Sequence, residues 1–225
     1  MGLHVYCIVP AGSAPPAELR GLDNAAVRGV PVGDLVVWVS DALDRPRPDA
    51  GGVRVHNSVI EAAMTDQITP VPSRFGQWFD SDHHAVAAII TAADRWRDLL
   101  RRVAGHVEFG VRITGADQPV AAREMHPAQA VSGTQYMKQL ANRRAQVQLW
   151  RAEADRLAAL IAGRAGNTIA DSRTEVIGSR VLSLAHLVAR QDVGAYHTTL
   201  QEVRAGEPAL RFLLTGPWPP YSFVG

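Results

Sequence analysis

Residues 107–113 have the sequence VEFGVRI, and this stretch decides how the chain divides into domains. Its apolar side chains alternate strictly with Glu, Gly and Arg, which is typical of a strand that buries one face. The apolar positions are Val107, Phe109, Val111 and Ile113. Because a helical pattern ends at Gly105, we place a domain boundary just before this strand. We therefore expect an N-terminal domain over residues 1–105 and a C-terminal domain over residues 106–225.

The sequence after this strand changes between helical and strand patterns. We expect a long helix from about Thr134 to Ala162, strands at 173–177 and 181–190 that pair around Gly178, a helix near 195–203 and a strand at 210–214. Together with the strand at 107–113, the predicted order is strand, helix, strand, strand, helix, strand. This order is the ferredoxin-like supersecondary pattern.

The long helix carries apolar residues at four-three spacing. They are Tyr136, Leu140, Val147, Trp150, Ala154, Leu157 and Ile161, and Arg143 interrupts the series. Such a seam suits packing on the domain's own sheet, and it also suits pairing with a second helix. Packing on the sheet is the more ordinary arrangement for a helix of this length, but the spacing is compatible with both.

The first half of the chain also mixes strands and helices. We expect strands at 3–9, 27–32 and 35–39, a helix around 53–65, an extended edge segment at 68–76 and a helix at 82–103. Ser58 and Glu61 have the spacing of a capping box, and Ser81 is a suitable cap for the second helix. The prolines of ITPVPSRFG exclude this segment from the middle of a sheet, since each removes a backbone donor.

Composition excludes several classes of protein. The 23 basic and 22 acidic residues give a formal net charge of +1, so the overall charge favours neither nucleic acid nor an anionic membrane. Cys7 is the only cysteine, which excludes an internal disulfide and a thiolate-rich metal site. No apolar run approaches the roughly 20 residues that span a bilayer, and the first residues lack signal-peptide features. We expect a cytoplasmic protein.

No catalytic, cofactor-binding or metal-binding motif stands out in the sequence. His83 and His84 form the only histidine cluster, but adjacent residues on a helix point about 100° apart and rarely bind one ion. There is no HExxH motif, no Gly-rich phosphate loop and no GxSxG elbow. We therefore expect no enzyme activity, no catalytic residue and no cofactor or metal.

Three stretches together resemble the gas vesicle protein L/F family. They are VHNSVIEAAM at 55–64 running into ITPVPSRFGQWF at 68–79, VEFGVRI at 107–113, and LTGPWPPYSFV at 214–224. Their joint order and spacing make the match specific across nearly the whole chain. Two details depart from the family pattern: Phe109 stands where Trp is common, and the long helix is less rich in lysine.

This resemblance implies both a fold and a function. It implies two α+β domains, an N-terminal ferredoxin-like domain and a C-terminal domain with a long helix. It also implies an accessory protein of gas vesicle assembly, located in the cytoplasm and at the gas vesicle. The expected partners are the gas vesicle shell protein and other gas vesicle accessory proteins, with no role for nucleic acid or membrane. The family has no assigned catalytic residues to carry over.

Two aromatic segments are candidates for the protein-binding surface. One lies at 74–79 and the other is the proline-rich tail at 215–222, which is stiff and loses little entropy on docking. The candidate binding residues are Trp78, Phe79, Trp218, Tyr221 and Phe223. The alternative is that these aromatic side chains only complete the cores of their own domains.

An enzyme is the competing hypothesis. Paired ferredoxin-like domains can enclose a haem or a small organic substrate, with His186 or His197 as the ligand. This alternative depends on fold analogy alone.

Overall fold

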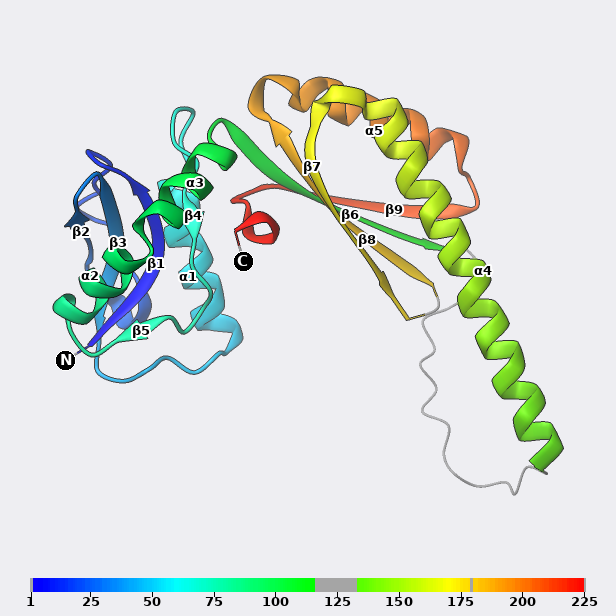
Figure 1. Cartoon of the computed structure of the whole chain (residues 1–225), viewed down its shortest axis with the longest axis horizontal. Coiled ribbons are helices and arrows are strands. Elements are labelled where there is room, and N and C mark those ends of the chain that lie inside the picture. The colour runs from blue at the N-terminus through cyan, green and yellow to red at the C-terminus, as the bar shows by residue number, and fades with distance from the viewer. Residues whose placement is uncertain (1, 116–132, 179, 225) are drawn as a thin grey trace. The chain divides into compact units, whose positions relative to one another are not determined.

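The computed structural model describes residues 2–115, 133–178 and 180–224, except for some side chains near the start of the longest helix. The chain forms two compact units, one of residues Met1–Glu108 with Gly216–Gly225 and one of residues Phe109–Thr215. Each unit contains a β-sheet with helices packed on it (Figure 1). The predicted α+β class is confirmed. The last ten residues, which we expected in the C-terminal domain, group with the first unit.

The second unit has the predicted order of elements. They are β6 (His106–Gly115), α4 (Gly133–Ala165), β7 (Ile169–Ile177), β8 (Val181–Ala189), α5 (Val193–Gly206) and β9 (Leu210–Trp218). The strands lie in the order β7-β8-β6-β9, and β7 and β8 form an antiparallel hairpin. This arrangement is the ferredoxin-like one.

The core of the second unit lies between the sheet and the two helices. The predicted inward side chains of β6 are all buried, as are Leu157 and Ile161 of α4 and Tyr196 of α5. Phe109 lies 5.1 Å from the Tyr196 ring, between ring centres. Packing of the long helix on the sheet, the first of our two alternatives, is thus observed for the C-terminal part of α4.

The strands of the first unit have the same spatial order as those of the second, but the helices fall at different places between them along the chain. The elements of the first unit are β1 (Gly2–Pro10), β2 (Val27–Val32), β3 (Leu35–Ala42), α1 (Ala50–Ala63), β4 (Val71–Pro72), β5 (Trp78–Phe79), α2 (Asp82–Thr91) and α3 (Ala93–Val103). The sheet has the order β2-β3-β1-β4, and the short strands β4 and β5 pair with different parts of β1. The predicted hairpin of β2 and β3 turns at Gly33, whose φ of +62° suits glycine.

Helices cover both faces of this sheet. On one face, Leu3 and Val5 of β1 pack with Ile89 of α2 and Val103 of α3. On the other face, side chains of β1 such as Tyr6 pack against α1. Strand β1 is therefore buried along almost its whole length, as a strand covered on both sides should be.

Two local predictions about helices were wrong. The helix expected at 82–103 is interrupted at Ala92, where the backbone leaves the helical region and α3 begins. Helix α1 starts at Ala50, earlier than expected, because the Asp49 carboxylate accepts hydrogen bonds from the first backbone N–H groups. Ser58 is therefore not a cap, and its hydroxyl donates to the Val55 carbonyl inside the helix at 2.8 Å. Ser81 caps α2 as predicted.

Over residues 2–115, 133–178 and 180–224, no helix has both the length and the apolar character that a membrane crossing requires. Within the same ranges, His, Cys, Asp and Glu side chains do not gather in any group of three or more that could bind a metal ion.

Candidate protein-binding site

The edge of the first sheet beside β1 is interrupted, and this interruption creates the candidate site. Strand β4 pairs with Cys7 and Ile8, whereas β5 pairs with Leu3 and His4. Between these two short strands, residues 73–77 belong to no strand.

A tight turn shapes the segment between β4 and β5. The Gln77 N–H donates to the Arg74 carbonyl at 3.2 Å, and Gly76 has a φ of +82°, which is the geometry that glycine allows in a type II turn. On either side of the turn, hydrogen bonds tie the segment to β1. The Ser73 hydroxyl donates to the Val5 carbonyl at 2.6 Å, and the Val5 N–H donates to the Gln77 carbonyl at 2.9 Å. The turn is thus fixed at the sheet edge.

A hollow of about 610 Å³ opens beside this turn, and its walls are mostly apolar. The lining side chains include Val5, Ile8, Phe75, Phe79, Trp96 and Tyr221. Two exposed arginines, Arg74 and Arg95, also line it, and the Arg95 guanidinium lies 5.3 Å from the centre of the Trp96 ring. We call this feature the edge hollow. It has the size and lining of a site for an apolar group flanked by cations.

The C-terminal tail forms one wall of the edge hollow. The Tyr221 hydroxyl donates to the Asn57 side-chain oxygen of α1 at 3.0 Å. Both the N–H and the hydroxyl of Ser222 donate to the Glu108 carboxylate, each at 2.7 Å. Phe223 is only 2% exposed. The stiff tail predicted from its prolines therefore docks on the first unit of its own chain.

Glu108 is the main polar anchor of the tail. Burial raises the pKa of this carboxyl group, and the hydrogen bonds from Ser222 act in the opposite direction. Replacing Glu108 with alanine removes both acceptors and leaves a backbone N–H unpaired, so we expect the first unit to lose about 2 kcal/mol of unfolding free energy. Urea unfolding measures this loss. Glu175→Ala, at an exposed position of β7, is the control, and equal stability of the two variants would contradict an anchoring role.

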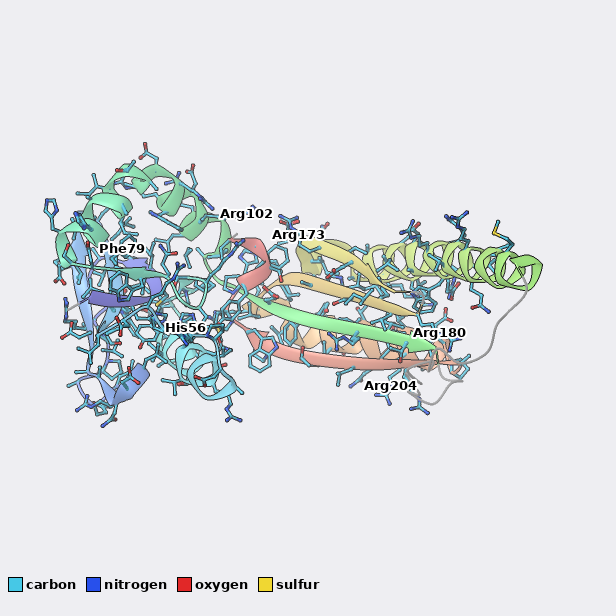
Figure 2. All side chains as sticks on the ribbon, turned by 90° about the horizontal axis from the view of Figure 1, so that it is seen from below. His56, Phe79, Arg102, Arg173, Arg180 and Arg204 are labelled. Carbon is cyan, nitrogen blue, oxygen red and sulfur yellow. The ribbon has the colours of Figure 1, made fainter. Side chains whose placement is uncertain are left out.

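A buried histidine pair lies behind the turn. His56 of α1, labelled in Figure 2, has its Nε2 3.1 Å from the Ser73 carbonyl, and its Nδ1 lies 2.8 Å from Nε2 of His4. Since a carbonyl only accepts, His56 Nε2–H donates to Ser73, and His4 Nε2–H donates to His56 Nδ1. Phe75 packs beside both rings, with centres 5.5 Å away.

Both histidines of this pair are neutral at physiological pH. Burial, with a smaller contribution from His56, lowers the pKa of His4 to about 3, and burial also lowers the pKa of His56. His4 Nδ1 is buried and has no hydrogen-bond partner among the described residues. His56 lies inside α1, which begins at Ala50.

The structure brings together two of the five predicted binding residues. Phe79 and Tyr221 line the edge hollow although they lie far apart in the sequence, and both are half-buried. Trp78 is half-buried on the neighbouring position of β5, where its ring lies against the backbone of Gly2. Trp218 is 39% exposed and Phe223 is packed inside, and neither lines the hollow.

The turn residue Phe75 and the α3 residue Trp96 are not among the five predicted binding residues. Phe75 lies in the candidate segment 74–79, with burial in the core as the alternative, and its position in the SRFGQ turn is the available signal. Trp96 belongs to the apolar stripe of the helix predicted at 82–103. That stripe indicates a buried face, but it does not indicate which end of the face stays uncovered.

The histidines of the competing enzyme hypothesis lie elsewhere. His186 is buried in the second unit, where its Nδ1 lies 2.8 Å from the Tyr196 hydroxyl and burial lowers its pKa to about 4. His197 packs its ring edge-on against Phe109, with centres 5.2 Å apart. Neither histidine lines the edge hollow.

Comparison with known proteins supports the resemblance drawn from the motifs. The family model described as "Gas vesicle synthesis protein GvpL/GvpF" matches residues 2–225. Gas vesicle protein L from a Streptomyces species is 32% identical over 233 residues, which cover 95% of this chain and 85% of that protein. The crystal structure of the gas vesicle protein GvpF from an Anabaena species superposes with a TM-score of 0.76 at 17% identity, covering 100% of this chain and 96% of that one.

A second crystal structure, of gas vesicle protein GvpF from Microcystis aeruginosa, superposes with a TM-score of 0.73 at 16% identity over 100% of this chain and 99% of that one. At such low sequence identities the two crystal structures establish only a shared fold. Membership of the family follows from the family model and from the Streptomyces relative. The chain therefore belongs to the gas vesicle synthesis protein GvpL/GvpF family and is involved in gas vesicle formation.

Proposed function

We propose that this protein acts in gas vesicle formation as a non-catalytic adaptor that holds an apolar segment of another gas vesicle protein in the edge hollow. The observation that carries the proposal is the convergence of Phe79 and Tyr221, from two distant segments, on one largely apolar hollow. The preferred partner is the shell protein, and other gas vesicle accessory proteins are the second choice. Membership of a family described as synthesis proteins supports a role in assembly.

The size of the hollow favours reversible binding. Covering on the order of 200 Å² of apolar surface, counting both the hollow and its occupant, contributes roughly 5 kcal/mol at about 25 cal/mol per Å². Association costs on the order of 4–15 kcal/mol in lost freedom, so the net affinity is modest. A holder of this kind can keep an aggregation-prone subunit in solution and still release it to a growing shell.

Charged side chains at the rim of the edge hollow can set the orientation of the bound segment. Arg74 and Arg95 are exposed beside it. A carboxylate next to the apolar segment of the partner would pair with these guanidinium groups and set the orientation of the segment. The described residues of this site carry no nucleophile and base in contact, and we propose no chemical step.

A pull-down with purified shell protein tests the adaptor role. We expect Tyr221→Ala to reduce the retained shell protein by about tenfold, because it removes an aromatic wall worth more than 1 kcal/mol. Gln77→Trp, at an exposed position that lines the hollow, should reduce binding by filling the space without removing a core contact. Trp218→Ala is the matched control, since Trp218 is an aromatic residue of the same tail outside the hollow.

Folding of each variant is checked by far-UV circular dichroism. Equal retention by the wild type, Tyr221→Ala and Gln77→Trp would refute binding in the edge hollow. A loss confined to Trp218→Ala would move the contact to the exposed part of the tail.

A further inference from the structure

The outer edge of β7 pairs with no strand in the part of the chain that the structure describes. In the sheet order β7-β8-β6-β9, β7 lies at the end, and β8 is its only neighbour (Figure 1). Residues 172–175, in the middle of β7, are all exposed, although successive residues of a strand point to opposite faces of the sheet. The helices of the unit therefore leave this stretch of β7 uncovered, and a further strand has room beside it.

The absence of proline distinguishes β7 from the strands at the other ends of the two sheets. An edge strand presents unpaired N–H and C=O groups, and proline protects such an edge because it lacks the N–H. Strand β2 contains Pro31, β4 contains Pro72 and β9 contains Pro217. The nine residues of β7 include neither proline nor glycine. Among these four strands, β7 is therefore the one best suited to pair with another strand.

We propose that β7 pairs antiparallel with β7 of a second copy of this chain, around a two-fold axis at Thr174. The sheets of the two second units then join edge to edge into one continuous sheet. A two-fold axis uses the same surface on both copies, so the assembly closes as a dimer and does not grow further. This inference concerns the second unit and does not rest on the function proposed for the edge hollow.

Charge complementarity favours a second copy in this register. With Thr174 on the axis, the residue before it in one copy lies opposite the residue after it in the other copy. Arg173 of each copy therefore faces the partner's Glu175, and both pairs lie on the same face of the joined sheet. Cross-strand pairs of opposite charge stabilise a sheet, as does the Thr–Thr pair that forms on the axis.

The charges for these pairs are present at the surface of β7. Glu175 is exposed and forms no ion pair with any residue that the structure describes. The guanidinium of Arg173, labelled in Figure 2, lies 3.3 Å from the Asp171 carboxylate of the same strand. Since a guanidinium has five N–H donors, Arg173 can bind the partner's Glu175 and keep Asp171. The dimer thus gives Glu175 a cation without breaking an existing ion pair.

Other ways of pairing two copies of β7 are less favourable. A parallel pair in register would place Arg173 against Arg173 and Glu175 against Glu175. An antiparallel pair centred on Arg173 would place Arg173 against itself and Asp171 against Glu175. Like charges directly opposite each other are destabilising. An antiparallel pair centred on Ser172 would include the irregularity in register between Ile169 and Asp171.

Sedimentation velocity on the full chain, over a range of concentrations, tests the proposal. We expect the wild type to dimerise. Arg173→Glu brings carboxylates together at both pairs, and Glu175→Arg brings guanidinium groups together, so each substitution should weaken the dimer by about tenfold or more. The double variant Arg173→Glu, Glu175→Arg restores both pairs with the charges exchanged. Its dimer should therefore be within about threefold of the wild type in affinity.

A mixture of the two single variants tests the register directly. Opposite charges meet at both pairs when one copy carries Arg173→Glu and the other carries Glu175→Arg. The mixture should therefore form dimers at concentrations where each variant alone is monomeric. Arg211→Glu makes the same change of charge as Arg173→Glu at an exposed position of β9, and this matched control should dimerise like the wild type. Far-UV circular dichroism checks that each variant is folded.

Several results would overturn the proposal. A wild type that stays monomeric up to about 1 mM would exclude a specific dimer. A dimer that persists in both β7 variants would place the contact elsewhere, and equal weakening by Arg211→Glu would reduce the effect to net charge. A mixture that fails to dimerise would exclude the pairing of Arg173 with Glu175. Amide hydrogen exchange at residues 171–177 should slow as the dimer forms, and an unchanged rate would also exclude pairing at this edge.

Discussion

Replacing Phe223 with alanine is expected to lower the unfolding free energy of the first unit by about 3–5 kcal/mol, the usual cost of emptying a buried Phe site. Phe223 is 2% exposed, and its neighbour Val224 joins the core beneath α2 and α3. Because a domain of this size is stable by only about 5–15 kcal/mol, such a loss is a large part of the total. Urea unfolding followed by circular dichroism measures it.

The same substitution separates a packing role from a binding role for the tail. Trp218→Ala removes a larger aromatic side chain from the same segment, but Trp218 is 39% exposed. We expect this control to change stability by less than about 0.5 kcal/mol. If Phe223→Ala left the stability unchanged and abolished partner binding, Phe223 would be an interface residue as first predicted from the sequence.

The second unit was the easier half to predict from the sequence. The strict alternation over residues 107–113 is a local pattern, and all four of its apolar side chains are buried in the folded unit. Of the four-three seam of the long helix, Ala154, Leu157 and Ile161 are buried, while the side chains of Tyr136 and Leu140 lie outside the described residues. The strand order β7-β8-β6-β9 follows once those elements are assigned, since few topologies accommodate that order of strands and helices. What the seam could not indicate is where the sheet ends, and therefore which part of α4 stays uncovered.

The first unit was harder because its helix boundaries depend on details that composition and periodicity do not show. Asp49 caps α1 within residues 45–52, whose two prolines and two glycines favour a connection over a helix start. The cap is local, and it begins the helix in spite of the glycines. The break at Ala92 divides a stripe of apolar residues that continues through both helices, so periodicity alone does not reveal it.

The candidate site was predicted only in part for the same reason. Aromatic residues near prolines and glycines are the candidates that the sequence offers, but their sequence does not determine which of them turn inward. Glu108 decides the position of the tail by binding Ser222, and these residues are separated by more than a hundred positions. A composition pattern cannot identify such a pair.

Stability is expected to fall as the pH is lowered from about 7 to 5, because two buried histidines resist protonation. Burial lowers the pKa of His4 to about 3 and that of His186 to about 4. An unfolded chain protonates histidine below a pKa of about 6.5, while the folded chain remains neutral at both positions. The unfolded state therefore binds more protons, and proton uptake favours unfolding as the pH falls.

The expected size of this effect follows from the same pKa values. At pH 5 each of the two histidines should lower the unfolding free energy of the unit that contains it by about 2 kcal/mol relative to neutral pH. The loss continues until the pH reaches the folded pKa values near 3 and 4, and it is absent above pH 7. His4 has no spare partner for a second ring proton, since its Nδ1 is buried and unpaired among the described residues.

Unfolding experiments at pH 7.5, 6 and 5 measure this dependence, with substitutions that remove one titration each. His186→Phe should flatten the pH dependence of the second unit, and His4→Phe should reduce that of the first, where the lowered pKa of His56 remains, whatever each does to stability at neutral pH. His83→Gln replaces an exposed histidine of α2 and is the matched control for a substitution that leaves the buried rings in place. A wild-type protein equally stable at pH 7.5 and 5 would mean that these rings accept protons in place, and that the pair behind the edge hollow is not held neutral by burial.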